Sequence, residues 1–140
     1  MSIWTTEHTI TTPATPERVF AVWADVPAWP TWDTGLISAT LDGPFVVGTT
    51  GTLHPEGAPG PLPFTLTQVT PGREFTDRTE FAGHVLTFEH LATATAAGTE
   101  VTVRVIVEGP DADHMGPGVA DDLPEAMTAL VGAAEATPAP

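Results

Sequence analysis

The chain of 140 residues contains no cysteine, and lysine and tyrosine are absent as well. Without cysteine there is no disulfide framework, no thiol nucleophile and no thiolate metal site. The absence of lysine excludes Schiff-base chemistry at a lysine amine. The serines are Ser2 and Ser38, and neither stands in a Gly-x-Ser-x-Gly setting, so a serine nucleophile of that kind is not expected.

Positive charge is scarce, because four arginines stand against eighteen acidic residues and the formal net charge is −14. Such a surface repels phosphate backbones and anionic lipid headgroups, which argues against nucleic-acid binding. No apolar run approaches the ~20 residues of a membrane-spanning helix. The first five residues lack the basic and apolar regions of a secretory signal. We therefore expect a cytoplasmic protein that does not insert into membranes.

Motifs for cofactors and metals are also missing. The sequence has no phosphate-binding loop and no dinucleotide fingerprint. Asp111, Asp113 and His114 are close in the sequence, but their spacing matches no strong metal motif, and acids near a helix start are stabilising on their own. We expect neither a metal nor a cofactor.

The composition is that of a globular protein, with 41% hydrophobic and 16% charged residues. The length predicts one domain over residues 1–135, and residues 136–140 are predicted to be a disordered tail. Residues 3–12 are rich in Thr and Ile and predict a strand.

A helix start follows the first strand. Thr15 is a capping residue, and Pro16 suits the first helical position, so a helix is predicted from there to about Asp25. The two prolines within Val26–Asp33 leave room for only a short helical turn.

From residue 35 to 109 the pattern alternates between strands and turns. The turns are marked by Gly and Pro, and the longest is the loop at 55–61. The predicted strands are 35–42, 48–54, 62–70, 73–81, 84–95 and 99–108.

One long helix is predicted to close the chain. Its apolar residues share one helical face: Val119, Leu123, Met127, Leu130, Val131 and Ala134. Pro124 lies inside this pattern and predicts a kink or a late helix start. The order of elements predicts an α+β fold in which a curved antiparallel sheet of about seven strands wraps around the C-terminal helix and encloses an apolar pocket. Two short helices follow the first strand.

Two hairpins predict which side chains face the pocket. A two-residue turn at Ala82–Gly83 pairs Asp77 with Phe88, and a tight turn at Ala97–Gly98 pairs Phe88 with Val107. Both hairpins agree on one apolar face, formed by Phe75, Phe81, Leu86, Phe88, Val101, Val103, Val105 and Val107. Arg78 and Arg104 are predicted on the outer face.

Asp77, His84 and His90 are the polar exceptions on this apolar face. His84 is next to a turn, where it can reach water. Asp77 and His90 are predicted to be diagonal neighbours in mid-strand, where an inward carboxylate needs a partner or solvent. One interpretation is an acid/base pair in which Asp77 orients His90 and His90 moves a proton beside a carbonyl. The alternative is a structural polar pair, or a bulge that turns Asp77 to solvent.

Further residues are candidates for contact with a ligand. Phe75, Leu86, Phe88 and Val105 are predicted to form the pocket wall. Trp32 is the best pocket candidate among the tryptophans, whereas Trp23 and Trp29 are assigned to the core. Other predicted pocket residues are His54 at the mouth, with a solvated loop histidine as the alternative, and Met115, Leu123 and Met127.

Several segments carry a resemblance to a known family. They are Ala14–Phe20, Ala24–Val26, Trp29–Asp33, Gly83–His90, Gly98–Val103 and Asp122–Ala126. These segments resemble polyketide cyclase/dehydrase-like proteins of the START-like (SRPBCC) superfamily. The resemblance implies a helix-grip fold with a deep hydrophobic cavity, in a superfamily that includes both aromatase/cyclases and carriers of hydrophobic molecules.

The functional hypothesis is therefore a cofactor-independent cyclase or dehydratase. It would hold a hydrophobic, carbonyl-bearing substrate in the cavity and act through His90 and Asp77 by acid/base catalysis. The alternatives are a carrier of a hydrophobic molecule or lipid without turnover, and a partner-binding domain whose cavity is collapsed. The protein is expected to be a monomer or a homodimer.

Overall fold

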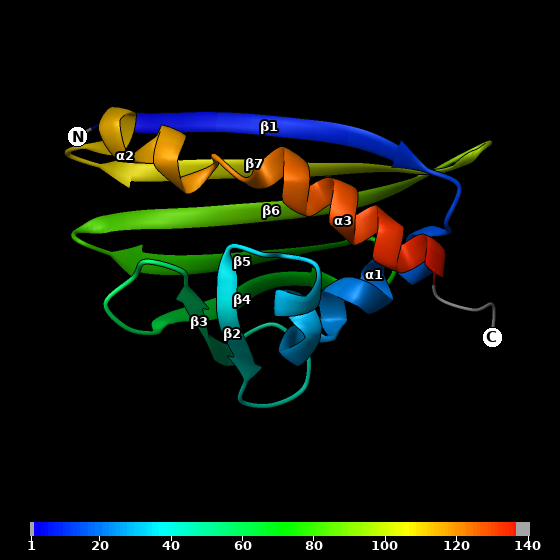
Figure 1. Cartoon of the computed structure of the whole chain (residues 1–140), viewed down its shortest axis with the longest axis horizontal. Coiled ribbons are helices and arrows are strands. Elements are labelled where there is room, and N and C mark those ends of the chain that lie inside the picture. Colours follow the sequence, from blue (N-terminus) through cyan, green and yellow to red (C-terminus); the bar gives the residue numbers. More distant parts are fainter. Residues whose placement is uncertain (1, 137–140) are drawn as a thin grey trace.

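The computed structural model describes residues 2–136, and it has an α+β fold in which the helices gather on the concave side of one curved sheet (Figure 1). The elements in chain order are β1 (Ser2–Thr12), α1 (Pro16–Ala24), the 3-10 helix η1 (Val26–Thr31), β2 (Leu36–Leu41), β3 (Thr50–Pro55), β4 (Leu62–Thr70), β5 (Glu74–Phe81), β6 (His84–Thr95), β7 (Gly98–Gly109), α2 (Ala112–Val119) and α3 (Leu123–Ala136).

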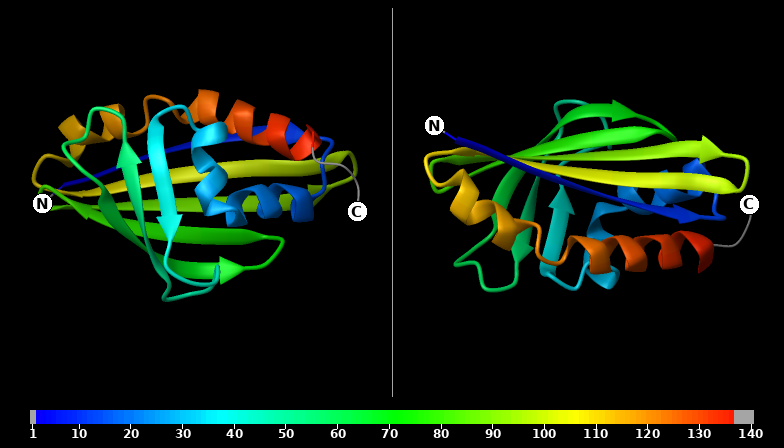
Figure 2. Two further views of the ribbon diagram at one scale, coloured as in Figure 1. Left: turned by 60° about the horizontal axis from the view of Figure 1, so that its bottom comes forward. Right: turned by 90° about the horizontal axis from the view of Figure 1, so that it is seen from above.

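The seven strands form one antiparallel sheet in the order β1-β7-β6-β5-β4-β3-β2. Strands β2 to β7 are joined in sequence, and β1 returns from the start of the chain to pair with β7. Figure 2 shows that the sheet bends, so that β2 and β3 cross the direction of β1 and β7, with α3 lying inside the bend. This is the helix-grip arrangement, and the predicted fold class is confirmed.

The register of the first hairpin is confirmed, and that of the second is shifted. Asp77 pairs with Phe88 as predicted. Phe88, however, pairs with Val105 rather than Val107, because the turn residues are Ala96 and Ala97. The shift is two residues, so each side chain keeps its predicted face, since strand side chains alternate with a period of two.

The helices after β1 form for local reasons. The Thr15 hydroxyl accepts a hydrogen bond from the Arg18 backbone N–H at 3.3 Å, which caps α1. The 3-10 helix η1 is fixed against the end of α1 because the Trp29 indole N–H donates to the Trp23 carbonyl at 2.8 Å. These two bonds place Trp23, Trp29 and the following Trp32 along one side of the sheet's interior.

The C-terminal part differs from the prediction. Residues 112–119 form a separate helix, α2, and Val119 ends it instead of belonging to the last helix. Helix α3 begins at Leu123, so Pro124 lies in its first turn, where proline is tolerated, and the predicted late start is confirmed. Ala136 is helical, in contrast to the predicted tail, and the rest of that tail lies outside the described residues.

Two hydrophobic clusters hold the helices to the sheet. The larger one packs α1 and α3 on the sheet through side chains that include Trp23, Phe75 and Leu130. The smaller one lies under α2 and includes Val107 and Ala112. Among the helices within residues 2–136, none is long and apolar enough to cross a membrane.

Candidate functional site

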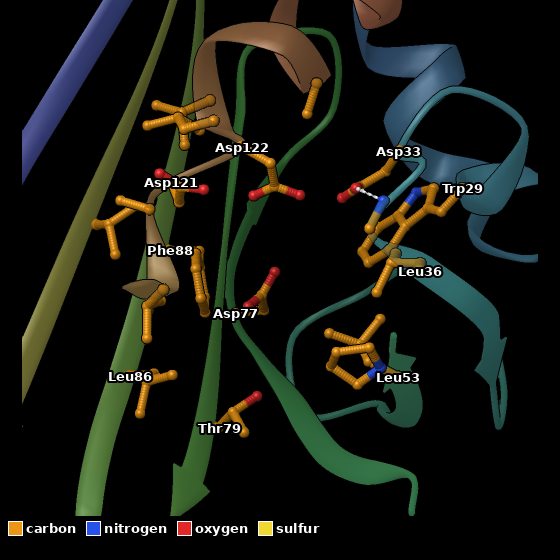
Figure 3. Close-up of a pocket in the computed structure, with 18 of the residues that line it drawn as sticks. Trp29, Asp33, Leu36, Leu53, Asp77, Thr79, Leu86, Phe88, Asp121 and Asp122 are labelled. Carbon is orange, nitrogen blue, oxygen red and sulfur yellow. Dashed lines mark hydrogen bonds between the residues drawn. The ribbon is translucent and has the colours of Figure 1, made fainter. Parts of the chain in front are cut away.

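A cavity of about 630 Å³ lies between the concave face of the sheet and the helices. Strands β5, β6 and β7 form its wall, η1 and the start of β2 close one side, and the α2–α3 connection and α3 cover it (Figure 3). The volume is within the range of small-molecule pockets. The interior is therefore hollow in the region where the sequence predicted a pocket.

Most of the residues predicted to contact a ligand do line this cavity. They are Trp32, Phe75, Leu86, Phe88, Val105, Leu123 and Met127, together with Asp77 and His90. Trp23 and Trp29 are buried as predicted, and both also contribute to the lining.

His54 and Met115 are placed elsewhere. Leu53 and Pro55 line the cavity, so His54 between them points to the opposite face of β3. Met115 lies on α2 and packs in the smaller hydrophobic cluster, and it does not itself line the cavity. No local pattern predicts α2 as a separate helix, and the position of Met115 depends on that helix.

Asp77 is the most unusual side chain of the cavity. It is 3% exposed, and its Oδ1 atom is buried without a hydrogen-bond partner. Burial raises the pKa of Asp77 to about 8, because the charged form loses its hydration. The carboxyl group is therefore largely protonated near pH 7, and a protonated carboxyl donates a hydrogen bond.

Two further polar atoms on the cavity lining share this condition. Thr79 Oγ1 and Trp32 Nε1 are buried without a partner, as Asp77 Oδ1 is, and all three residues line the cavity. Thr79 follows Asp77 by two positions in β5, so their side chains are neighbours on one face, as Figure 3 shows. Buried polar atoms normally have hydrogen-bond partners. These three atoms therefore mark positions where a bound molecule would supply the partner.

His90 is held by neighbours on β5 and α1. Its ring stacks on Phe75 with 3.9 Å between ring centroids, and Trp23 contacts it edge-on. His90 Nδ1 lies 3.3 Å from the Phe75 carbonyl, which makes Nδ1 the protonated nitrogen and leaves a lone pair on Nε2. Burial lowers the pKa of His90 to about 4, against the opposing effect of hydrogen bonds to the backbone of Phe75 and Phe88.

The predicted orientation of His90 by Asp77 is wrong. Within residues 2–136, no hydrogen bond or ion pair joins the two side chains, and the Phe75 carbonyl takes the orienting role instead. His90 is directly opposite Phe75 in the sheet, and the Phe75 carbonyl lies 3.3 Å from its Nδ1. Asp77 and His90 therefore stand as two separate polar groups on one wall.

His84, the third polar exception, is structural. It is 4% exposed, so the expectation that it reaches water is wrong. Its Nδ1 lies 2.8 Å from the Ala82 carbonyl, and its Nε2 accepts a hydrogen bond from the Asp111 backbone N–H at 3.0 Å. It thereby ties the β5–β6 turn to the residue that precedes α2.

Two carboxyl groups that the sequence analysis missed stand at the mouth. Asp33 follows η1, and Asp122 precedes α3, and both line the cavity. Gly35 lies between them: its N–H donates to Asp33 Oδ1 at 3.1 Å, and a Cβ there would collide with the Asp122 carboxylate. Burial and the nearby charge of Asp122 raise the pKa of Asp33 to about 6. Their separation in the chain left no signal for this pairing.

The comparisons with known proteins agree with this fold. The family model described as polyketide cyclase / dehydrase and lipid transport matches residues 4–135. A comparison with curated protein sequences gave no match.

Solved structures with the same fold differ widely in sequence. The Zhui aromatase/cyclase from Streptomyces sp. R1128 is 18% identical with a TM-score of 0.78, over 96% of this chain and 94% of that one. Norcoclaurine synthase from Thalictrum flavum, in complex with dopamine and hydroxybenzaldehyde, is 11% identical with a TM-score of 0.77, over 99% and 90%. Ara h 8.0201 is 15% identical with a TM-score of 0.77, over 97% and 100%. The TM-scores show that these proteins share the fold of this chain, and at identities this low the similarity shows the fold alone.

Proposed function

Because the chain belongs to the polyketide cyclase / dehydrase and lipid transport family of the START-like (SRPBCC) superfamily, we propose that it binds a hydrophobic, carbonyl-bearing small molecule and promotes its cyclisation or dehydration. The observation that carries this proposal is the buried, unpartnered carboxyl group of Asp77 on the wall of an apolar cavity. A binding fold with a protonated acid in its cavity supports acid catalysis on a carbonyl or hydroxyl group.

Asp77 is proposed to be the acid. With a pKa of about 8, it carries its proton at neutral pH and donates it to an oxygen atom of the substrate. The Thr79 hydroxyl, on the same face of β5, hydrogen-bonds to the same polar end of the substrate. A water-poor cavity strengthens both interactions.

His90 is proposed to be the base. Its Nε2 lone pair removes the proton on the carbon next to the carbonyl, while Asp77 protonates the departing hydroxyl group. The C–H and C–O bonds break, a C=C bond forms, and one water molecule leaves, so atoms and charge balance when a proton passes from His90 back to Asp77. The proposed binding residues, Trp32, Phe75, Leu86, Phe88, Val105, Leu123 and Met127, hold the apolar part of the substrate.

A carrier without turnover is the second candidate. It is favoured by the pKa of about 4 at His90, since a base that weak removes a proton from carbon slowly. Under this alternative Asp77 and Thr79 only hydrogen-bond the polar end of the ligand.

The test separates turnover from binding. The probe is 4-hydroxy-4-phenylbutan-2-one, whose dehydration gives a conjugated enone detectable by its absorbance, and 4-phenylbutan-2-one is the unreactive analogue for affinity. We expect Asp77→Asn and His90→Ala each to lower the dehydration rate about 100-fold or more, with the analogue's affinity changed only a few-fold. The control Asp113→Asn alters an exposed carboxylate of α2 that does not line the cavity, and its rate should be that of the unsubstituted protein.

Equal rates in the two variants and the unsubstituted protein would contradict the proposed catalytic roles. Binding of the analogue with no dehydration by the unsubstituted protein would favour the carrier.

A further inference from the structure

The ionisable groups on the cavity lining are nearly all acidic. The carboxyl groups are Asp33, Glu56, Asp77, Asp121 and Asp122, and the other ionisable group is His90. No arginine occurs among the described residues that line the cavity. Arg78 and Arg104 point to the outer face of the sheet, where each is half exposed and contacts a glutamate side chain.

Three of the carboxyl groups point into one space from three elements. Figure 3 shows Asp77 on β5, Asp33 after η1 and Asp122 before α3, with their oxygen atoms directed toward the open part of the cavity. Asp33 and Asp122 approach each other around Gly35, where no side chain separates them. Burial is the main cause of the raised pKa of Asp33, and the nearby charge of Asp122 raises it further, so the two carboxylates repel each other.

This arrangement determines the charge of a suitable ligand. A carboxylate or phosphate group entering the mouth would meet negative groups with no cation to compensate, in a protein whose net charge is already −14. A cation placed between Asp33 and Asp122 would relieve their repulsion. Trp29 and Trp32 also line the cavity, and an organic cation is stabilised where it lies over the face of an aromatic ring.

An organic cation fits better than a metal ion. Within residues 2–136, no three side chains of His, Asp or Glu lie close enough together to hold a metal. The wall beyond the mouth is apolar, formed by side chains such as Leu86 and Phe88, and Asp77 with its unpartnered oxygen lies on that wall. The cavity thus offers two carboxyl groups at its mouth, an apolar wall, and the neutral polar group of Asp77 on that wall.

We propose that the ligand is an apolar amine, bound with its ammonium group between Asp33 and Asp122 and its neutral polar end at Asp77 and Thr79. The proposal rests on the proposed function, because it requires that the cavity take up a small molecule. Beyond that function, the amine proposal specifies that the small molecule is positively charged and that the mouth of the cavity recognises this charge.

Three probes of one size test the charge preference: 4-phenylbutylamine, 4-phenylbutan-1-ol and 4-phenylbutyrate. Their affinities are measured by calorimetry and by the fluorescence of the tryptophans that line the cavity. We expect the amine to bind roughly tenfold more tightly than the alcohol, and the carboxylate to bind most weakly, at low ionic strength. Added salt should reduce the difference between amine and alcohol.

Variants then locate the preference. Asp33→Asn and Asp122→Asn keep the shape of each side chain, and an Asn at position 33 still accepts the Gly35 hydrogen bond. Each substitution should lower the affinity for the amine several-fold and leave that for the alcohol unchanged, and the double variant should bind amine and alcohol equally. Asp113→Asn, which removes the same charge from exposed α2, should keep the preference intact.

The possible failures are distinguishable. Equal binding of amine and alcohol by the unsubstituted protein, or tightest binding of the carboxylate, would overturn the amine proposal and leave the proposed cavity function standing. A preference that survives in the double Asn variant would overturn the assignment to Asp33 and Asp122. No binding of any of the three probes would overturn both proposals, since even the neutral probe should enter an apolar cavity of about 630 Å³.

Discussion

Replacing Asp77 by Asn is expected to make the protein more stable while impairing its proposed chemistry. The carboxyl group is 3% exposed and has a raised pKa because its charged form is poorly solvated. Asn has almost the same shape and never ionises. The substitution therefore removes an energetic cost of folding without creating a cavity.

The size of the gain follows from the two pKa values of Asp77. An aspartate in the unfolded chain ionises near its ordinary value of 3.8, and the folded protein holds this one at about 8. At pH 7, keeping the proton on Asp77 during folding costs on the order of 4 kcal/mol. Water inside the cavity and the unpaired amide of Asn reduce the net benefit, so we expect about 1–3 kcal/mol of added stability.

The dependence on pH identifies Asp77 as the cause. For an acid with a raised pKa, the folded state binds more protons than the unfolded state, so stability falls as the pH rises from 3.8 to about 8. His90, with its pKa lowered to about 4, acts oppositely and contributes a rise in stability between about 4 and 6.5. Asp33, with a pKa of about 6, is mostly ionised above pH 6.5. Between 6.5 and 8, Asp77 is therefore the dominant contributor among these three.

Urea unfolding, followed by tryptophan fluorescence between pH 6.5 and about pH 8, measures this slope. From this group the unsubstituted protein should lose about 1.4 kcal/mol of unfolding free energy per pH unit near pH 6.5 and about half of that near pH 8, where Asp77 is half ionised, and Asp77→Asn should lose almost none. Asp113→Asn should retain the slope. Parallel pH profiles for the unsubstituted protein and Asp77→Asn would refute the claim that Asp77 is protonated in the fold.

Three further substitutions test the structural reasoning by urea unfolding. His84→Ala removes two hydrogen bonds of a buried ring and should cost about 2–4 kcal/mol, and no loss would contradict its structural role. Gly116→Ala places a Cβ against the Trp4 ring and should cost about 1–3 kcal/mol. The control Gly118→Ala adds a Cβ in open space and should be neutral or slightly stabilising. Equal effects of the two substitutions would contradict the packing of Gly116 against Trp4. Arg104→Ala breaks only exposed ion pairs and should change stability by less than about 1 kcal/mol, so a larger loss would show that they matter more than their exposure indicates.

The strands and their inward faces are predictable from the sequence because the signal is local. Alternation with a period of two places Asp77, Phe88 and Val105 on the inner face, and that assignment survives a register error of two residues. The predicted partner of Phe88 is wrong because Gly98 begins β7 instead of belonging to the turn, which Ala96 and Ala97 form. The face to which a strand side chain points is therefore easier to predict from the sequence than its exact partner on the next strand.

Helix α2 and the mouth of the cavity are not predictable in this way. The residues Gly116-Pro117-Gly118 oppose a helix locally, and α2 forms there because Gly116 lets the Trp4 ring of β1 pack against it. Asp33 and Asp122 meet only in the folded chain. Thr79 is predictable as an inward-facing residue, because it shares the inner face of β5 with Asp77, but threonine is so common on strands that its type alone does not indicate a ligand contact.

The pairing of β1 with β7 has a consequence for how the protein folds. Strands β6 and β7 are joined by two residues, whereas the pairing of Thr12 with Thr99 encloses most of the chain, which costs roughly 3 kcal/mol more in loop closure. We expect the central hairpins to form first and β1 and α3, which complete the core around the cavity, to dock last. A cavity ligand such as 4-phenylbutan-2-one should then slow unfolding and leave the refolding rate unchanged. Stopped-flow refolding accelerated by the ligand would show instead that the cavity already exists at the rate-limiting step.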